Sequence, residues 1–242
     1  MHERSARLLD LISAGHNYAD DARRLEWIIE AVTPIPIESI LDVGCGTGNH
    51  LAALRPRFAV AGVDLDPAVL AVASGRLPGV TLHLADMTAF DLGRRFDAVL
   101  CLGSAIGYAL TVPALRQTIA GFAAHLNLGG VVVVSPWVYL EEWIDGHLDA
   151  EFLDLPEIKV ARFAVSGRNG RVSTLDFHYL VAEAGSVEAF SERHELGLFT
   201  DGEYRAAFIA AGLTVSWLPK ALEDSGLYVG VLPPPPDASP VG

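Results

Sequence analysis

The chain has 242 residues, of which 51% are hydrophobic and 19% charged, and its formal net charge at pH 7 is −13. This length suits one α/β domain with an insertion, and the apolar content is ample for a full core. The acidic balance argues against a nucleic acid or an anionic membrane surface as partner, because both need basic protein surface. The first residues, MHERSARLLDLISAG, lack a signal-peptide core, and no apolar run approaches the length of a membrane span, so we expect a cytoplasmic protein.

Two helices are predicted before the first strand. Residues 3–14 and 18–32 carry apolar residues at helical spacing, and Asn17 is placed to cap the second segment. Pro34 and Pro36 then end that helix.

Residues 40–49, ILDVGCGTGN, are the most informative stretch of the chain. An apolar strand stops at Gly44, Gly46 and Gly48 and is followed at once by helix-compatible residues. Such a turn leaves room for a ligand against bare backbone and points helix N–H groups toward it. Dinucleotide-binding enzymes use a similar loop, so the glycines alone leave the ligand open.

The acidic residue before the first glycine favours one reading of this loop. With Asp42, the pattern D-x-G-x-G-x-G resembles the first motif of class I S-adenosylmethionine (SAM)-dependent methyltransferases. The apolar run 58–63 then ends at Asp64, where a carboxylate can accept hydrogen bonds from both ribose hydroxyls of NAD or SAM. After the run 80–84, Asp86 and Met87 look like the methyltransferase motif that meets the adenine amino group and ring.

Strands and helices continue to alternate beyond this point. A strand over 96–101, a helix over 112–126 and a strand over 130–135 imply a parallel sheet whose ligand lies at the carboxyl ends of the strands. Helix 201–211 and strands 213–218 and 226–232 follow later, and an antiparallel last strand is typical of methyltransferases. The predicted fold class is therefore α/β, a doubly wound, seven-stranded Rossmann-like methyltransferase sheet.

An insertion interrupts this sheet after the fifth strand. Residues 158–165, 171–182 and 187–199 alternate apolar and polar residues, which predicts a three-stranded antiparallel meander. An excursion at the ligand face either covers the substrate or makes a dimer contact, and we favour a substrate lid. The predicted organisation is a SAM-binding core over 1–136 and 200–232, a lid over 137–199 and a disordered Pro-rich tail over 233–242.

A closer resemblance spans nearly the whole chain after about residue 18. The segments GFAAHLNLGGVVVVSPW, FSERHELGLFTDGEYRAAFIAAGL and GLYVGV resemble bacterial N-methyltransferases of nucleotide-linked deoxyamino sugars. The resemblance implies SAM as cofactor, a small-molecule amine as substrate and a catalytic role for His125, which would orient the amine or take its proton. A histidine at a helix end can also be a cap. In this family a tyrosine of the N-terminal segment lies beside the acceptor, whereas LLDLISAG offers only leucine or isoleucine there.

The expected cofactor contacts combine the motif residues with their neighbours and with a second family tyrosine: Tyr18, Asp42, Gly44, Cys45, Gly46, Gly48, Asp64, Leu65, Asp86, Met87 and Leu102. Expected substrate contacts are Ser104, Tyr108, Trp137, Arg193 and His194. Along one strand only one of Arg193 and His194 can face inward.

The two cysteines, Cys45 and Cys101, form neither a disulfide framework nor a metal-binding spacing, and we expect no metal. Three alternatives stay open: a small-molecule O-methyltransferase, a non-catalytic SAM-binding protein, and an NAD-dependent reductase. The sequence leaves the oligomeric state open, including a homodimer.

Overall fold

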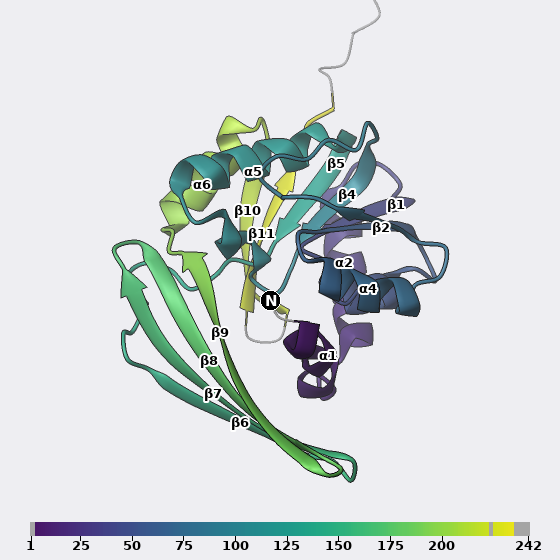
Figure 1. The fold of residues 1–242 in the computed structure, drawn as a ribbon. Coiled ribbons are helices and arrows are strands. Elements are labelled where there is room, and N and C mark those ends of the chain that lie inside the picture. Colours follow the sequence, from purple (N-terminus) through teal and green to yellow (C-terminus); the bar gives the residue numbers. More distant parts are fainter. Residues whose placement is uncertain (1–2, 223–224, 235–242) are drawn as a thin grey trace, which may run out of the picture.

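A central sheet of seven strands organises the computed structural model, which describes residues 3–222 and 225–234 (Figure 1). The order β10-β11-β5-β4-β1-β2-β3 and the antiparallel pairing of β11 with β5 confirm the predicted fold class. Its strands are β1 (Ser39–Val43), β2 (Ala59–Asp64), β3 (Thr81–Leu84), β4 (Phe96–Cys101), β5 (Leu126–Val134), β10 (Thr214–Leu222) and β11 (Ser225–Val231).

Helices cover both faces of this sheet, because strand residues buried on alternate sides face two apolar layers. On one face, α5 (Val112–Ala124) and α6 (Asp201–Ala210) pack on a core that includes Leu41 and Val99. On the other, α2 (Tyr18–Val32) and α3 (Asn49–Leu54) pack on a core that includes Ile40. The Asn17 side chain accepts from the Asp20 N–H at 3.0 Å, which confirms the predicted cap of α2.

The remaining short elements connect the strands. They are α4 (Pro67–Arg76), which was predicted as a helix, and the 3₁₀ helix η1 (Ala105–Ala109), which the sequence pattern did not predict. The predicted N-terminal helix is α1 (Glu3–Ile12), which precedes α2 and the first strand. β5 begins four residues before the predicted start, with Gly129 in a left-handed turn of the backbone and a register shift against β4.

The insertion forms a separate antiparallel sheet with four strands rather than the predicted three. It consists of β6 (Leu148–Asp154), β7 (Ile158–Asn169), β8 (Val172–Glu183) and β9 (Ser186–Gly197), in that order. We call this sheet the arm, because it extends away from the central sheet (Figure 1). The sequence pattern did not predict β6 because three of its seven residues are acidic, and acidic residues are depleted in strands.

Helix α1 lies between the arm and the core. Leu8 packs with Ile158, Val160 and Tyr179 of the arm, while other residues of α1 contact α4. No helix among the described residues is long and apolar enough to cross a membrane. Of the predicted disordered tail, Pro233 and Pro234 are exposed and outside any strand or helix, and residues 235–242 lie outside the described residues.

Candidate active site

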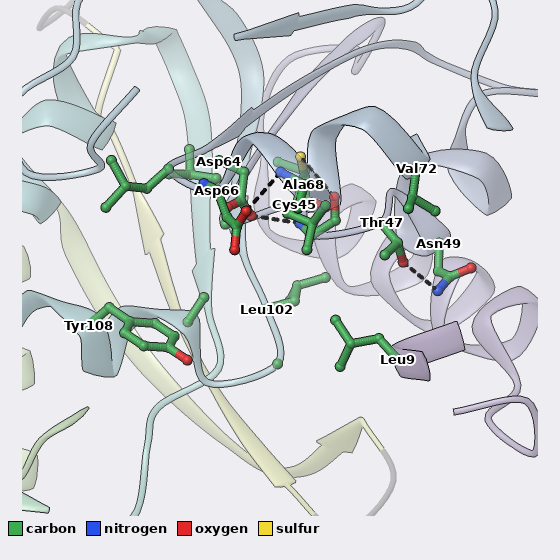
Figure 2. Close-up of a pocket in the computed structure, with 18 of the residues that line it drawn as sticks. Leu9, Cys45, Thr47, Asn49, Asp64, Asp66, Ala68, Val72, Leu102 and Tyr108 are labelled. Atoms are coloured by element: carbon green, nitrogen blue, oxygen red, sulfur yellow. Dashed lines mark hydrogen bonds between the residues drawn. The ribbon is translucent and has the colours of Figure 1, made fainter. Parts of the chain in front are cut away.

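A cavity of about 2270 Å³ opens where the carboxyl ends of the parallel strands face α1 and the arm. Its walls come from the glycine loop, the ends of β2 and β4, the N-terminal helices and the inner side of the arm. Figure 2 shows part of this lining, with Leu9 of α1, Cys45 of the glycine loop and Tyr108 of η1 around the cavity. This is the edge where open α/β sheets bind ligands, so the topology and the cavity point to the same place.

The glycines of this loop allow close packing on two sides, one toward the cavity and one toward α4. Gly44 has φ +76°, and a Cβ there would lie 2.6 Å from the Cβ of Ala105. Gly44, Cys45 and Gly46 line the cavity. Gly48, expected to contact the cofactor, instead faces away from the cavity: a Cβ there would lie 2.7 Å from Leu77, so this glycine lets the loop pack on α4.

Two carboxylates lie beneath the loop. Asp64 accepts hydrogen bonds from the N–H groups of Gly46 (2.8 Å) and Asp66 (3.0 Å), one on each oxygen. Each oxygen keeps a second lone pair, so the carboxylate can still accept from ribose hydroxyls. Burial raises the pKa of Asp64.

Asp42 is the more unusual of the two. It is 2% exposed, and its Oδ1 has no hydrogen-bond partner among the described residues. Burial, with a smaller contribution from Asp64, raises the pKa of Asp42 to about 6, although His50 opposes the shift. A buried carboxylate oxygen without a partner at a cavity calls for a cation or a hydrogen-bond donor.

The far end of the cavity is formed after β3 and β4. Asp86 accepts from both the N–H and the hydroxyl of Thr88 through one oxygen, at 2.8 Å each, and lines the cavity beside Met87. Leu65 and Leu102 supply apolar surface nearby. These side chains lie where the sequence pattern placed them.

Cys45 and Cys101 are both free and buried. Burial, together with the negative charges of Asp42 and Asp64, raises the pKa of both thiols. Neither is therefore an activated nucleophile.

Asp10 of α1 makes contacts that sequence reasoning missed. Its carboxylate accepts from the Thr47 hydroxyl (2.6 Å), from Asn49 (3.0 Å) and from Arg76 (2.5 Å). The second guanidinium nitrogen of Arg76 donates to the Thr47 carbonyl. One side chain thus ties α1 to the glycine loop and to α4, and no local pattern in the sequence reveals contacts across 66 residues.

A second cluster lies beside the loop. The Oδ2 of Asp21 is bonded to His16 (2.6 Å) and to His50 (3.2 Å), and the Tyr18 ring packs against both imidazoles. The three polar side chains come close enough to be considered as metal ligands, but these hydrogen bonds already account for the geometry. Tyr18, His16 and His50 all line the cavity.

The opposite wall is formed by η1 and the arm. The Tyr108 hydroxyl and Nδ1 of His194 are 2.5 Å apart, and Nε2 of His194 lies 2.8 Å from Glu192. Arg193, the next residue on β9, is exposed and makes two hydrogen bonds to Asp176. Only His194 points at Tyr108, as alternation along a strand requires, although both residues contribute to the cavity wall.

His125, the expected catalytic residue, is not in the cavity. It is the C-cap of α5, immediately before β5, and so lies at the amino end of that strand, away from the carboxyl ends. Its Nδ1 donates to the Gly121 carbonyl (2.7 Å), its Nε2 accepts from the Leu92 N–H (3.0 Å), and its ring stacks on Phe90. Both nitrogens are occupied by backbone, so the helix-cap alternative fits the structure and the catalytic role does not.

Ser104 and Trp137 also lie outside the cavity wall. The Ser104 hydroxyl donates to the Pro136 carbonyl at 2.8 Å, which joins the ends of β4 and β5. The Trp137 indole N–H donates to Ser173 at 3.0 Å, and its ring lies beside Trp143. Trp137 thus ties the start of the insertion to β8, and neither side chain lines the cavity.

The groups around the loop fit SAM chemically. SAM carries an α-ammonium and a sulfonium, which suit the unpartnered oxygen of Asp42, and a ribose, which suits Asp64. Its adenine can meet Asp86 and Met87 in a part of the cavity with apolar walls. This donor set suits a cationic nucleoside better than it suits a dinucleotide with its pyrophosphate.

Comparisons with known proteins agree with this site. A family described as a methyltransferase domain matches residues 40–130. The chain is 41% identical over 222 residues to dTDP-3-amino-3,4,6-trideoxy-alpha-D-glucopyranose N,N-dimethyltransferase from Streptomyces venezuelae, covering 91% of this chain and 93% of the relative. It is 38% identical to dTDP-3-amino-3,6-dideoxy-alpha-D-glucopyranose N,N-dimethyltransferase from Streptomyces fradiae, covering 93% and 90%.

Solved structures show the same relationship. SAM-bound CalS10, an amino pentose methyltransferase from Micromonospora echinaspora, matches with a TM-score of 0.83 and 41% identity, covering 91% of this chain and 93% of that one. Streptomyces venezuelae DesVI matches with a TM-score of 0.88 and 39% identity, covering 96% and 98%. The chain is a SAM-dependent methyltransferase and belongs to the family that these amino-sugar N-methyltransferases form.

Proposed function

We propose that this enzyme methylates the amine of a nucleotide-linked amino sugar in secondary metabolism. The observation that carries the proposal is the identity of 41% over 91% of the chain with a dimethyltransferase of a dTDP-linked amino sugar. The cavity supports it, because three cationic side chains line it, Arg7 on α1 and Arg162 and Arg193 on the arm. Cationic groups at that end suit an anionic nucleotide, even in an acidic protein.

We assign the cofactor to the glycine-loop side of the cavity. Asp64 would hold the ribose, Asp86 and Met87 the adenine, and Tyr18 the methionine carboxylate, with Leu65 and Leu102 as apolar walls. When bound, SAM supplies an activated methyl group on its sulfonium. The chain's own contribution is to orient the acceptor nitrogen in line with that methyl group and to exclude water.

The acceptor is assigned to the arm side. The arm, with α1, would act as a lid over the carboxyl ends of the central strands, with Tyr108 and His194 nearest the sugar and Arg162 and Arg193 nearest the nucleotide. Each arginine has a carboxylate partner, Glu151 for Arg162 and Asp176 for Arg193. A diphosphate would compete with these carboxylates for the guanidinium groups.

An assay with matched acceptors tests the proposal. The enzyme, SAM and a dTDP-linked amino sugar should give a product heavier by one or two methylene units, detected by mass spectrometry. The same nucleotide sugar with a hydroxyl in place of the amine is the control for the O-methylation alternative. If only the hydroxyl analogue is methylated, the enzyme is an O-methyltransferase and the proposal is wrong. If SAM binds but no methyl group is transferred to either acceptor, the protein is a non-catalytic SAM-binding protein.

A substitution of Arg162 tests where the nucleotide of the acceptor binds. Arg162→Met should raise KM for the nucleotide-linked sugar by about 10-fold or more and leave KM for SAM unchanged, because only the acceptor loses a charged donor. Lys159→Met, on the same strand and paired with Asp154, is the control. Equal effects of the two substitutions would contradict the assignment of the nucleotide to Arg162.

A homodimer is proposed through the outer face of the arm. Apolar side chains on that face are between 37% and 71% exposed. Contiguous exposed apolar surface marks association sites. The face comprises Leu148, Phe152, Phe163, Val165, Leu180 and Val187. Light scattering should show a dimer, and Phe163→Glu should give a monomer that still binds SAM; a monomeric native protein would remove this proposal.

A cytoplasmic location belongs to the same proposal. Both cysteines of the chain are free thiols, as expected in a reducing compartment. Fractionation of the producing cells would test it.

A further inference from the structure

We propose that Tyr108, His194 and Glu192 form a proton relay that removes the proton of the acceptor ammonium, a role that rests on the proposed N-methylation. The Tyr108 hydroxyl, on η1, touches His194 at 2.5 Å, and His194 touches Glu192 at 2.8 Å. All three belong to the acceptor side of the site, and Tyr108 and His194 line the cavity. A methyl acceptor needs a free lone pair, so an amine that arrives as ammonium must first lose a proton.

The position of Tyr108 suits the first step. It lies six residues after Leu102, which follows β4, and the residue as a whole is 46% exposed where it borders the cavity. In Figure 2 its hydroxyl points into the space between Leu102 and Leu9. The nitrogen of an acceptor in that space can donate a hydrogen bond to the Tyr108 oxygen, which makes Tyr108 the residue that touches the substrate.

The hydrogen bonds fix a direction for the proton. Burial, followed by the negative charge of Glu192, raises the pKa of Tyr108 to about 12, so the phenol stays protonated and donates to Nδ1 of His194. The Nε2–H of His194 then donates to the Glu192 carboxylate. This is the neutral tautomer in which Nδ1 is the acceptor.

The step balances without another reactant. An ammonium N–H bond breaks as an O–H bond forms on Tyr108, while the original Tyr108 proton passes to Nδ1 of His194. The result is a neutral amine, an intact phenol and an imidazolium paired with the Glu192 carboxylate. The proton returns to solvent between turnovers.

Glu192 is held as a stable counter-ion. It is 9% exposed, and its second oxygen accepts from the Ser5 hydroxyl at 2.6 Å. A buried carboxylate that holds an imidazole by one nitrogen sets its tautomer and stabilises its charged form. His194 and Glu192 act through Tyr108 and are positioning residues for the reaction.

Three variants test the relay: Tyr108→Phe, His194→Gln and the double variant. Each single change should keep SAM affinity and KM for SAM but lower kcat by about 10²-fold near neutral pH. The double variant should be no slower than the slower single one, because both changes interrupt one path. His178→Gln is the control, since this histidine lies on the outer face of the arm and bonds Ser191 there.

The rate at alkaline pH separates proton removal from simple placement of the sugar. At about pH 9.5 more of the acceptor amine is already free, so the defect of His194→Gln should shrink strongly relative to about pH 7. The charged or titratable groups that face this path are Tyr108 on η1, Glu192 on β9, Tyr179 on β8, Arg162 on β7 over the Phe177 ring, and Asp64 and Asp66 near Tyr108.

Each outcome decides between the claims. A defect in His194→Gln that is equal at both pH values, or multiplicative losses in the double variant, overturns the relay. Full activity of all three variants also overturns the relay. In each of these cases the proposed function still stands, provided that the wild-type enzyme methylates the amine. A wild-type enzyme that methylates no amine removes the function itself. Thermal unfolding and S-adenosylhomocysteine binding establish that each variant is folded; where His194→Gln is not, Tyr108→Phe tests the same path.

Discussion

The hydroxyl of Thr47, in the glycine loop, donates a hydrogen bond to the carboxylate of Asp10, in α1, at 2.6 Å. Arg76 of α4 reaches the other oxygen of the same carboxylate. Burial raises the pKa of Asp10, but the hydrogen bonds from Thr47, Arg76 and Asn49 outweigh this effect and hold the pKa below its ordinary value. The conformation of the cofactor loop therefore depends on a helix that precedes it by 37 residues.

Asp10→Ala should lower the melting temperature and weaken S-adenosylhomocysteine binding by about 1–3 kcal/mol, because three donors lose their acceptor. Because the pKa of Asp10 is lower in the folded protein than in the unfolded chain, its carboxylate stabilises the fold at pH values above the unfolded pKa. This stabilisation is lost as the pH falls through the pKa of the folded protein. The difference in melting temperature between wild type and variant should be constant near neutral pH and shrink below about pH 4. Asp20→Ala, which removes a surface carboxylate from α2, is the control; equal effects would contradict the role of Asp10.

Asp42→Asn should stabilise the unliganded enzyme at pH 8 by about 1–3 kcal/mol and weaken SAM binding. Its raised folded pKa means that the cost of the carboxylate begins once the pH rises above the unfolded pKa of about 4 and is complete above about pH 6, so the stabilisation by Asp42→Asn should be smaller at pH 5 than at pH 8. Unfolding curves at pH 5 and pH 8, with and without SAM, measure both effects. A variant less stable than wild type at both pH values would show that the Asp42 carboxylate has a partner in solution.

His125→Asn should destabilise the fold by about 1–3 kcal/mol, because asparagine cannot bridge Gly121 and Leu92 and leaves the half-buried Leu92 N–H without its acceptor. Its kcat, measured well below the melting temperature, should stay within about twofold of wild type. A large loss of kcat with an unchanged melting temperature would restore the catalytic role that the sequence resemblance implied.

Asp64→Ala should weaken SAM binding by about 1–3 kcal/mol, since the ribose loses a charged acceptor and Gly46 loses its partner. Calorimetry with SAM, S-adenosylhomocysteine and NADH measures this, and wild type should give no heat with NADH. Asp91→Ala, in an exposed loop, provides the comparison. Unchanged affinity in Asp64→Ala would place the ribose elsewhere.

The central fold was predictable because its signals are local, and the cavity residues that we assign to the cofactor have equally local signals. A buried strand, a run of glycines and a carboxylate at the next strand end occupy one stretch each, as Gly44, Asp64 and Asp86 show. The acceptor side was harder to predict. Tyr108 and His194 were both candidates, but their contact joins residues 86 apart, and only the path of the arm brings them together.

The error at His125 has a physical cause as well. A histidine at the end of a helix followed by a strand has the same local pattern whether it caps the helix or faces a substrate, and only the orientation of the strand decides. β5 begins directly after His125 and runs toward the cavity, so His125 lies at the amino end of the strand and the cavity lies at its carboxyl end. Asp10 shows the converse: an acidic residue on an amphipathic helix reads as a surface charge until its three partners are known.

Helix α1 carries Asp10, which is fixed to the cofactor loop, and Ser5, which is fixed to Glu192 on the acceptor side. We therefore expect occupancy of one half of the cavity to affect ligand binding in the other half through this helix. Any free energy by which SAM favours the docked position of α1 must reappear, by thermodynamic reciprocity, as tighter binding of the acceptor, and the two dissociation constants should change by the same factor. Ser5→Ala, which contacts no cofactor group, should reduce that shared factor toward one when each ligand is titrated in the presence and absence of the other.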